Sequence, residues 1–218
     1  MVNINYLIAA VPAIIIIWLA IKPRALDPQT QHGLNAENKT LQSLMKLPNE
    51  FILFNNLDIP CERSGKNHET DMIVLGKNSV FVVEIKGNVG QIFCQENESD
   101  WKVTKTTFRG TEYEKTLRNP IIQAKSRVND LLKFFKTHGS SPWVQGVVYF
   151  ADDRAELYEL NTLSGKVPVL KNEADLLKFI STFQPERKPT GAKMKNAKSC
   201  LLKLRSVTIA SHKQRQSQ

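Results

Sequence analysis

The chain has 218 residues, of which 41% are hydrophobic, and this excludes a disordered protein because a sizeable core can form. Its net charge of +9 is unevenly distributed, since residues 186–218 hold nine Lys/Arg and one Glu (+8) and residues 22–185 carry only +1. Three cysteines without a CxxC pair argue against a disulfide framework and a cysteine-rich zinc site, and they fit reduced thiols in a reducing compartment.

The first predicted element, residues 1–21, is a transmembrane anchor that contacts the membrane through residues 4–21. The sixteen residues Tyr6–Ile21 are uncharged and span roughly 24 Å as a helix, against a hydrocarbon core of ~30 Å. Lys22 and Arg24 follow directly, which places the C-terminal part in the cytoplasm, as in a bacterial inner membrane. Two alternatives remain open, a cleaved signal peptide and a buried helix of a soluble protein.

Residues 22–32 contain two prolines and predict a juxtamembrane linker, and the domain itself is expected at residues 33–184. A helix is predicted from Gly33 to Pro48, and further elements follow in chain order. The predicted strands are residues 51–59, 70–76, 80–87, 143–151 and 167–170, with shorter strands of the same sheet in GNVGQIFC and DWKVTKTTF. The predicted helices are residues 119–138 and 172–179. This order indicates an α/β fold, a mixed central sheet flanked by helices.

The long helix at residues 119–138 has clear start and stop signals. Asn119 is a candidate N-cap, Pro120 suits the first turn, and Gly139 is a typical residue after a helix end. The apolar strand after it is expected to be buried on both faces. Trp101 and Trp143 are interpreted as core residues, and His68 as a loop residue rather than a base.

The last segment, residues 185–218, is predicted to be a basic, flexible tail. Its charge of +8 would attract polyanions, either nucleic acid or anionic lipid. The alternative is a solvated terminus without a partner.

Glu84 and Lys86 end a strongly apolar predicted strand and are the strongest candidates for chemistry. Side chains alternate along a strand, so the two point the same way, roughly 7 Å apart, beside Val80 and Val82. Charges among apolar neighbours are costly unless they pair or bind a ligand. In a hairpin closed at residues 77–79, Asp71 lies opposite them. The alternative reading is an ion pair at a strand end.

Two carboxylates beside a lysine suit a hard cation such as Mg²⁺ or Mn²⁺, which prefers oxygen ligands. Asp71, Glu84 and the backbone carbonyl of Ile85 are the candidate ligands. A metal held there could activate water and stabilise a phosphate under in-line attack. Lys86 could orient or deprotonate that water, or bind the phosphate directly.

Five sequence pieces resemble the NERD family, the nuclease-related domain of the PD-(D/E)XK nuclease superfamily. In order they are GLNAE (33–37), TDMIVLG (70–76, with threonine at the proline position), VFVVEIKGNVGQI (80–92), Asp100-Trp101 and NPIIQ (119–123). The resemblance implies a restriction-endonuclease-like fold and a metal-dependent nuclease that hydrolyses phosphodiester bonds, with DNA the expected substrate. An inactive module that binds nucleic acid or protein at the membrane is the alternative, and a homodimer is a further expectation.

The resemblance also implies roles for individual residues. Asp71 and Glu84 would be metal ligands and Lys86 the catalytic lysine. Glu37 would be a helix carboxylate near the metal and a further candidate ligand, and Gln123 would point from the long helix into the site. Two of these residues have ordinary alternatives, because Glu37 suits a helix first turn and Gln123 could bond to the sheet edge.

Overall fold

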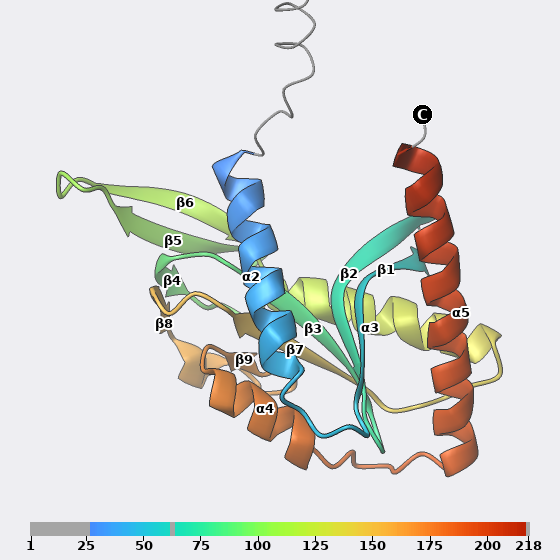
Figure 1. Ribbon diagram of the computed structural model, residues 1–218. Coiled ribbons are helices and arrows are strands. Elements are labelled where there is room, and N and C mark those ends of the chain that lie inside the picture. Colours follow the sequence, from blue (N-terminus) through green and yellow to red (C-terminus); the bar gives the residue numbers. More distant parts are fainter. Residues whose placement is uncertain (1–26, 62–63, 217–218) are drawn as a thin grey trace, which may run out of the picture. The chain divides into compact units, whose positions relative to one another are not determined.

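A computed structural model gives the structure of residues 27–61 and 64–216 (Figure 1). The predicted anchor and residues 22–26 of the predicted linker lie outside these ranges. Within them, none of the helices combines the length and the apolar composition that crossing a membrane requires. The elements are α2 (Pro28–Leu44), β1 (Ile52–Cys61), β2 (Lys66–Leu75), β3 (Val80–Lys86), β4 (Gly90–Phe93), β5 (Asp100–Thr106), β6 (Glu112–Arg118), α3 (Pro120–Thr137), β7 (Val144–Phe150), β8 (Ala155–Tyr158), the 3₁₀ helix η1 (Leu160–Thr162), β9 (Val169–Leu170), α4 (Glu173–Thr182) and α5 (Gly191–Gln216).

The first helix begins earlier than its sequence suggested. Helix α2 starts at Pro28, inside the predicted linker, and not at Gly33. The Asp27 carboxylate accepts hydrogen bonds from the backbone N–H groups of Gln29 and Thr30. A proline in the first turn needs no N–H partner there, so Pro28 starts this helix within residues that we predicted to be a linker.

The strands form two sheets, which corrects the prediction of one. The larger sheet has the order β1-β2-β3-β7-β9, antiparallel from β1 to β3 and parallel from β3 to β9. The smaller sheet has the order β6-β5-β4-β8 and includes β6 and β8, which the sequence reading missed. Strand β3 already pairs with β2 and β7 on its two sides, so β4 has no place beside it. Gly90, at φ 101°, begins β4 and turns the chain into the second sheet.

Helices cover both faces of the larger sheet (Figure 1). One core cluster joins Val80 and Val82 of β3 to side chains of α3 and α5. A second cluster joins Phe81, Val83 and Ile85 to side chains of α2 and α4. The apolar residues of β3 therefore alternate between two buried faces. By the same alternation Glu84 and Lys86 belong to the face that α3 covers.

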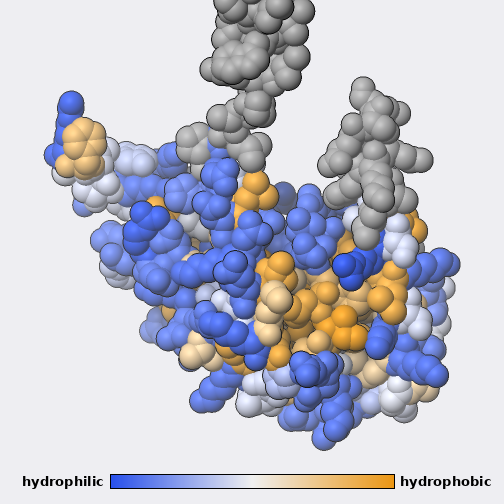
Figure 2. Space-filling model, in the orientation of Figure 1, coloured by the Kyte–Doolittle hydropathy of each residue, from blue (hydrophilic) through white to orange (hydrophobic). Residues whose placement is uncertain are grey.

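The C-terminal segment corrects the expectation of a flexible tail. It forms helix α5, and its buried residues belong to the core cluster that contains Val80 and Val82: Met194, Ala197, Cys200, Leu201 and Leu204. These residues recur every three or four positions, so one stripe faces β1 and the lysines point outward. Figure 2 shows apolar side chains gathered over β1, between α2 and α5.

The side chains of strand β1 switch faces in the middle of the strand. Phe54 and Leu57 lie in the same core cluster although they are three residues apart, which regular alternation does not allow. Asn56 lies between them with φ 50°, a conformation that asparagine tolerates better than most residues. Beyond Asn56, Leu57, Ile59 and Cys61 therefore share one face, the face toward α3 and α5.

The predicted helix ends are confirmed at the positions that carry a capping residue. The Asn119 side chain accepts hydrogen bonds from the N–H groups of Ile121 and Ile122, and Asn172 caps α4 in the same way. Gly139, at φ 70°, follows the end of α3. Because Asn119 also donates to the backbone carbonyls of Gln95, Glu96 and Glu98, the start of α3 is fixed against the loop before β5.

Candidate active site

Asp71, Glu84 and Lys86 lie together at the end of the β2–β3 hairpin. The Ile85 N–H donates a hydrogen bond of 2.8 Å to Asp71 Oδ2. Lys86 Nζ lies 2.7 Å from Glu84 Oε1, and both side chains are largely buried. The β2–β3 pairing brings Met72 opposite Val83, so Asp71 and Glu84 follow as neighbours at the point where the two strands separate.

The backbone of Ile85 also faces Asp71. The Lys86 carbonyl accepts a hydrogen bond from the Ala151 N–H, which follows β7, so the peptide groups of Ile85 point to the other side of β3. The bond from the Ile85 N–H to Asp71 is consistent with that direction. The Ile85 carbonyl therefore lies on the side of Asp71, where it can serve as an oxygen ligand.

Glu37 lies close to this group. Burial and the negative charge of Glu69 raise its pKa, and the positive charge of Lys86 lowers it in part. The close approach of α2 depends on Gly87, because a Cβ there would lie 3.0 Å from the His32 carbonyl and 3.1 Å from the Ala36 Cβ. A glycine directly after Lys86 therefore lets α2 pass the end of β3, with Glu37 one residue after Ala36.

In the absence of a cation, the negative charges of the carboxylates repel one another. Burial raises the pKa of Asp71 to about 7, and the charges of Glu84 and Glu37 add to this effect. The Ile85 N–H and Lys86 act in the opposite direction. A divalent cation would relieve the repulsion, so this set of oxygen donors fits a hard metal ion.

Glu69 is a member of the group that the sequence reading missed. Its charge acts on Glu37, and it lies two residues before Asp71 on β2. We began the predicted strand at Thr70, whereas β2 begins at Lys66. Glu69 is itself exposed, so only the effect of its charge on Glu37 identifies it.

Gln123 stands on α3, one turn after the cap at Asn119. It is half-buried, and its Oε1 is buried without a hydrogen-bond partner among the described residues. Such an unpaired amide oxygen is costly unless water or a ligand satisfies it. Gln123 also lines a cavity of about 600 Å³ that runs along α3.

The walls of this cavity are basic. Arg118, Lys125, Arg127 and Lys133 line it, and Asp130 is the carboxylate among its lining residues. Arg127 Nε donates a hydrogen bond of 3.0 Å to the Glu69 carbonyl, which joins α3 to β2. A basic hollow that includes Gln123 has the charge that a phosphate backbone requires.

Comparison with known proteins gives one finding. The model of NERD, the nuclease-related domain family, matches residues 32–151, more than half of the chain. The matched region contains the five residues Glu37, Asp71, Glu84, Lys86 and Gln123. No curated protein and no solved structure matches the chain.

Proposed function

Because the chain belongs to the NERD family of nuclease-related domains, we propose that it is a metal-dependent nuclease that hydrolyses phosphodiester bonds in DNA. The family is assigned to the PD-(D/E)XK superfamily, and a mixed sheet with helices on both faces supports a restriction-endonuclease-like fold. The observation that carries the proposal is the convergence of Asp71, Glu84 and Lys86 at the end of the β2–β3 hairpin. The half-buried Gln123 and the basic cavity that it lines on α3 support it.

The residues have separate roles in this mechanism. Asp71, Glu84 and the Ile85 carbonyl hold Mg²⁺ or Mn²⁺, with Glu37 as a further ligand. The bound ion supplies a Lewis acid for the phosphate and lowers the pKa of water. Lys86 Nζ, held by Glu84, orients the attacking water as an ammonium, or accepts the proton of that water when it is a neutral amine.

Gln123 and the basic cavity place the substrate. The unpaired Gln123 Oε1 accepts a hydrogen bond from the attacking water, which offsets its own burial. Arg118, Lys125, Arg127 and Lys133 attract the phosphate backbone on the α3 side. This local charge supports DNA binding even though residues 22–185 carry a net charge of only +1.

The proposal includes attachment to a membrane. Residues 1–21 would anchor the chain, with the nuclease domain on the cytoplasmic side, as Lys22 and Arg24 favour. Helix α5 would add attraction to nucleic acid or anionic lipid through its exposed Lys195, Lys198 and Lys203.

A second candidate is a non-catalytic module of the same fold that binds nucleic acid. The observation in its favour is the Lys86–Glu84 ion pair, because such a pair also stabilises a strand end without any chemistry. The basic cavity serves binding equally well in either case. The two candidates differ in whether Lys86 is needed for a reaction.

The test is DNA cleavage by the full-length chain in mild detergent, on plasmid and linear DNA with Mg²⁺ or Mn²⁺. We expect cleavage that EDTA stops and that Glu84→Ala and Lys86→Ala reduce by at least ~100-fold, the usual contribution of a proton-transfer group. Lys77→Ala is the matched control, because Lys77 is exposed in the turn at the other end of β3.

Each outcome decides between the candidates. Cleavage that survives Lys86→Ala would contradict the assigned site. A folded wild-type chain that binds DNA with the help of Arg118 and Lys133, but cuts none, would support the binding module instead.

A further inference from the structure

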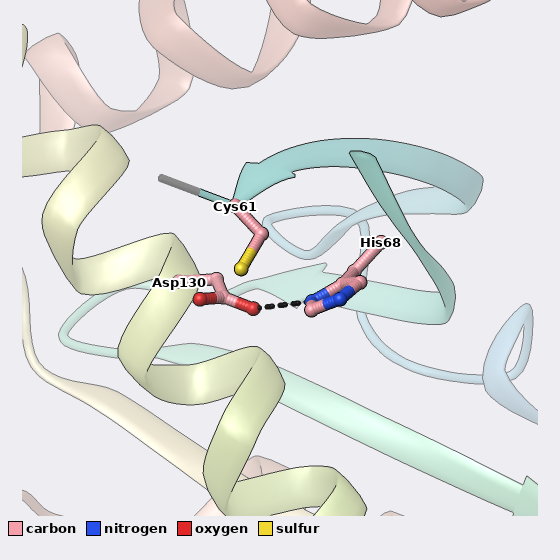
Figure 3. Close-up of side chains that lie close together, drawn as sticks. All are labelled: Cys61, His68 and Asp130. Atoms are coloured by element: carbon pink, nitrogen blue, oxygen red, sulfur yellow. Dashed lines mark hydrogen bonds and ion pairs between the residues drawn. The ribbon is translucent and has the colours of Figure 1, made fainter. Parts of the chain in front are cut away.

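Three side chains of different chemistry meet between α3 and the β1–β2 hairpin (Figure 3). The Cys61 Sγ, a ring nitrogen of His68 and a carboxylate oxygen of Asp130 all lie within 4.8 Å of one another. His68 Nδ1 lies 2.8 Å from Asp130 Oδ2. Cys61 and Asp130 are buried and His68 is partly exposed, so the group is shielded but reachable.

The fold explains why residues so distant in the sequence come together. In the hairpin, Cys61 pairs with Lys66 and Ile59 with His68, so Cys61 and His68 are diagonal neighbours on one face. Because the side chains of β1 switch faces at Asn56, that face is directed toward α3. Asp130 follows Gln123 by two helical turns and so lies on the same side of α3.

We propose that Cys61, His68 and Asp130 form a second metal site, for Zn²⁺ or a similar thiophilic divalent ion. Thiolate, imidazole and carboxylate are the usual zinc ligands. Magnesium avoids sulfur, so this site differs in kind from the oxygen donors around Asp71. One thiolate and one carboxylate balance the two charges of the ion, and a neutral imidazole adds none.

The geometry needs little adjustment for a bound ion. Zinc–ligand bonds of ~2.0–2.3 Å in a tetrahedron place ligand atoms roughly 3.5 Å apart. The atoms here lie at 4.8 Å or less, so side-chain rotations of about 1 Å complete the arrangement. On binding, the Cys61 thiol loses its proton, and Nδ1 of His68 binds the ion while its proton resides on Nε2.

The fourth coordination position opens toward solvent. Cys61, His68 and Asp130 all line the basic cavity of about 600 Å³, from which a water molecule can reach the ion. His68 precedes Asp71 by three residues on β2, roughly 10 Å along the strand, so the two metal sites are separate.

A metal ion bound at this site would cross-link two elements of the fold. It would join β2, which carries Asp71, to α3, which carries Gln123. The hydrogen bond from Arg127 to the Glu69 carbonyl already connects the same two elements. The ion would therefore be a positioning group and would take no part in hydrolysis.

The experiment is a titration of the metal-free, full-length chain with Co²⁺, followed by absorption spectroscopy. We expect one thiolate-bound Co²⁺ per chain, detected by its thiolate-to-metal charge-transfer band and separate from any Co²⁺ at the oxygen site around Asp71. Zn²⁺ should displace this ion and raise the Tm. Cys61→Ser should remove the band and the rise in Tm. Cys200→Ser is the matched control, since Cys200 is similarly buried but belongs to the core on the inner face of α5.

Further variants separate the two metal sites. His68→Ala and Asp130→Asn should weaken Co²⁺ binding by more than about 100-fold, beyond the ~10–100-fold that loss of an outer-shell partner causes. Glu84→Gln should leave the thiolate band intact. Absence of the band in the wild-type chain, or its persistence in Cys61→Ser, would overturn the proposal whether or not the chain cuts DNA.

Discussion

Replacing Asp71 with asparagine should stabilise the metal-free protein at neutral and alkaline pH. The Asp71 carboxylate is buried beside Glu84, and its pKa is raised from 3.8 to about 7. Asparagine has the same shape, and its oxygen can still accept the hydrogen bond from the Ile85 N–H. The substitution therefore removes the charge and keeps the contact.

The size of the effect follows from proton linkage. Between pH 4 and 7 the unfolded chain loses the Asp71 proton while the folded chain keeps it, so wild-type stability falls as pH rises. Each pH unit is worth ~1.4 kcal/mol, so the variant's advantage in unfolding free energy should grow by about 4 kcal/mol across this range. Above pH 7 both states are ionised, and the advantage should stay constant.

The assay is urea unfolding of both chains in EDTA from pH 4 to 9, followed by tryptophan fluorescence, because Trp101 is fully buried. Added Mg²⁺ should stabilise the wild type at pH 8 and have little effect on Asp71→Asn. A pH-independent difference between the two chains, or a variant that is less stable at pH 8, would refute the reasoning.

Two further predictions concern stability and use the same unfolding assay. Asn119→Ala should lower the unfolding free energy by about 3 kcal/mol, because it removes the α3 cap and the amide donor of the Glu96 and Glu98 carbonyls, while the Gln95 carbonyl keeps its bond from Trp101. Asn172→Ala removes only a cap on α4 and should cost about 1 kcal/mol; equal losses would contradict the role given to the Asn119 amide. Leu201→Ala should cost about 2–5 kcal/mol because Leu201 is fully buried on the inner face of α5, whereas the neighbouring Leu202 is 44% exposed and its replacement should cost under ~0.5 kcal/mol. Similar small losses would mean that α5 does not belong to the core.

The β2–β3 hairpin was accessible to sequence reasoning because its signals are local. Two apolar runs separated by a short polar turn fix which residues face each other, and alternation then places Glu84 and Lys86 on one side. Capping residues are local signals as well, so the start of α3 at Asn119 was predicted. The prediction for α5 was wrong because the nine basic residues of the segment 186–218 outweighed the helical spacing of Met194, Ala197 and Leu201, which the sequence also contains.

Other features depend on contacts that no local pattern records. The left-handed conformation of Asn56 reverses which residues of β1 face α3, and an asparagine within a strand predicts this only weakly. Asp130 is 62 residues from His68, so their hydrogen bond exists only once α3 lies on the sheet. The separation into two sheets likewise follows from a long-range contact. Strand β3 pairs with β7, which comes much later in the sequence.

Helix α3 connects the Asn119 cap, the β1–β2 hairpin and the candidate active site. Its start is fixed by Asn119, and two further contacts, Arg127 with the Glu69 carbonyl and Asp130 with His68, attach it to β2. Gln123 lies between the first contact and the other two, and Asp71 follows directly along β2. Because a packed helix shifts as a unit, we expect a change at His68 to alter the position of Gln123 relative to β2. The hairpin beyond Asn56 would then influence the site's geometry although it supplies none of the proposed Mg²⁺ ligands.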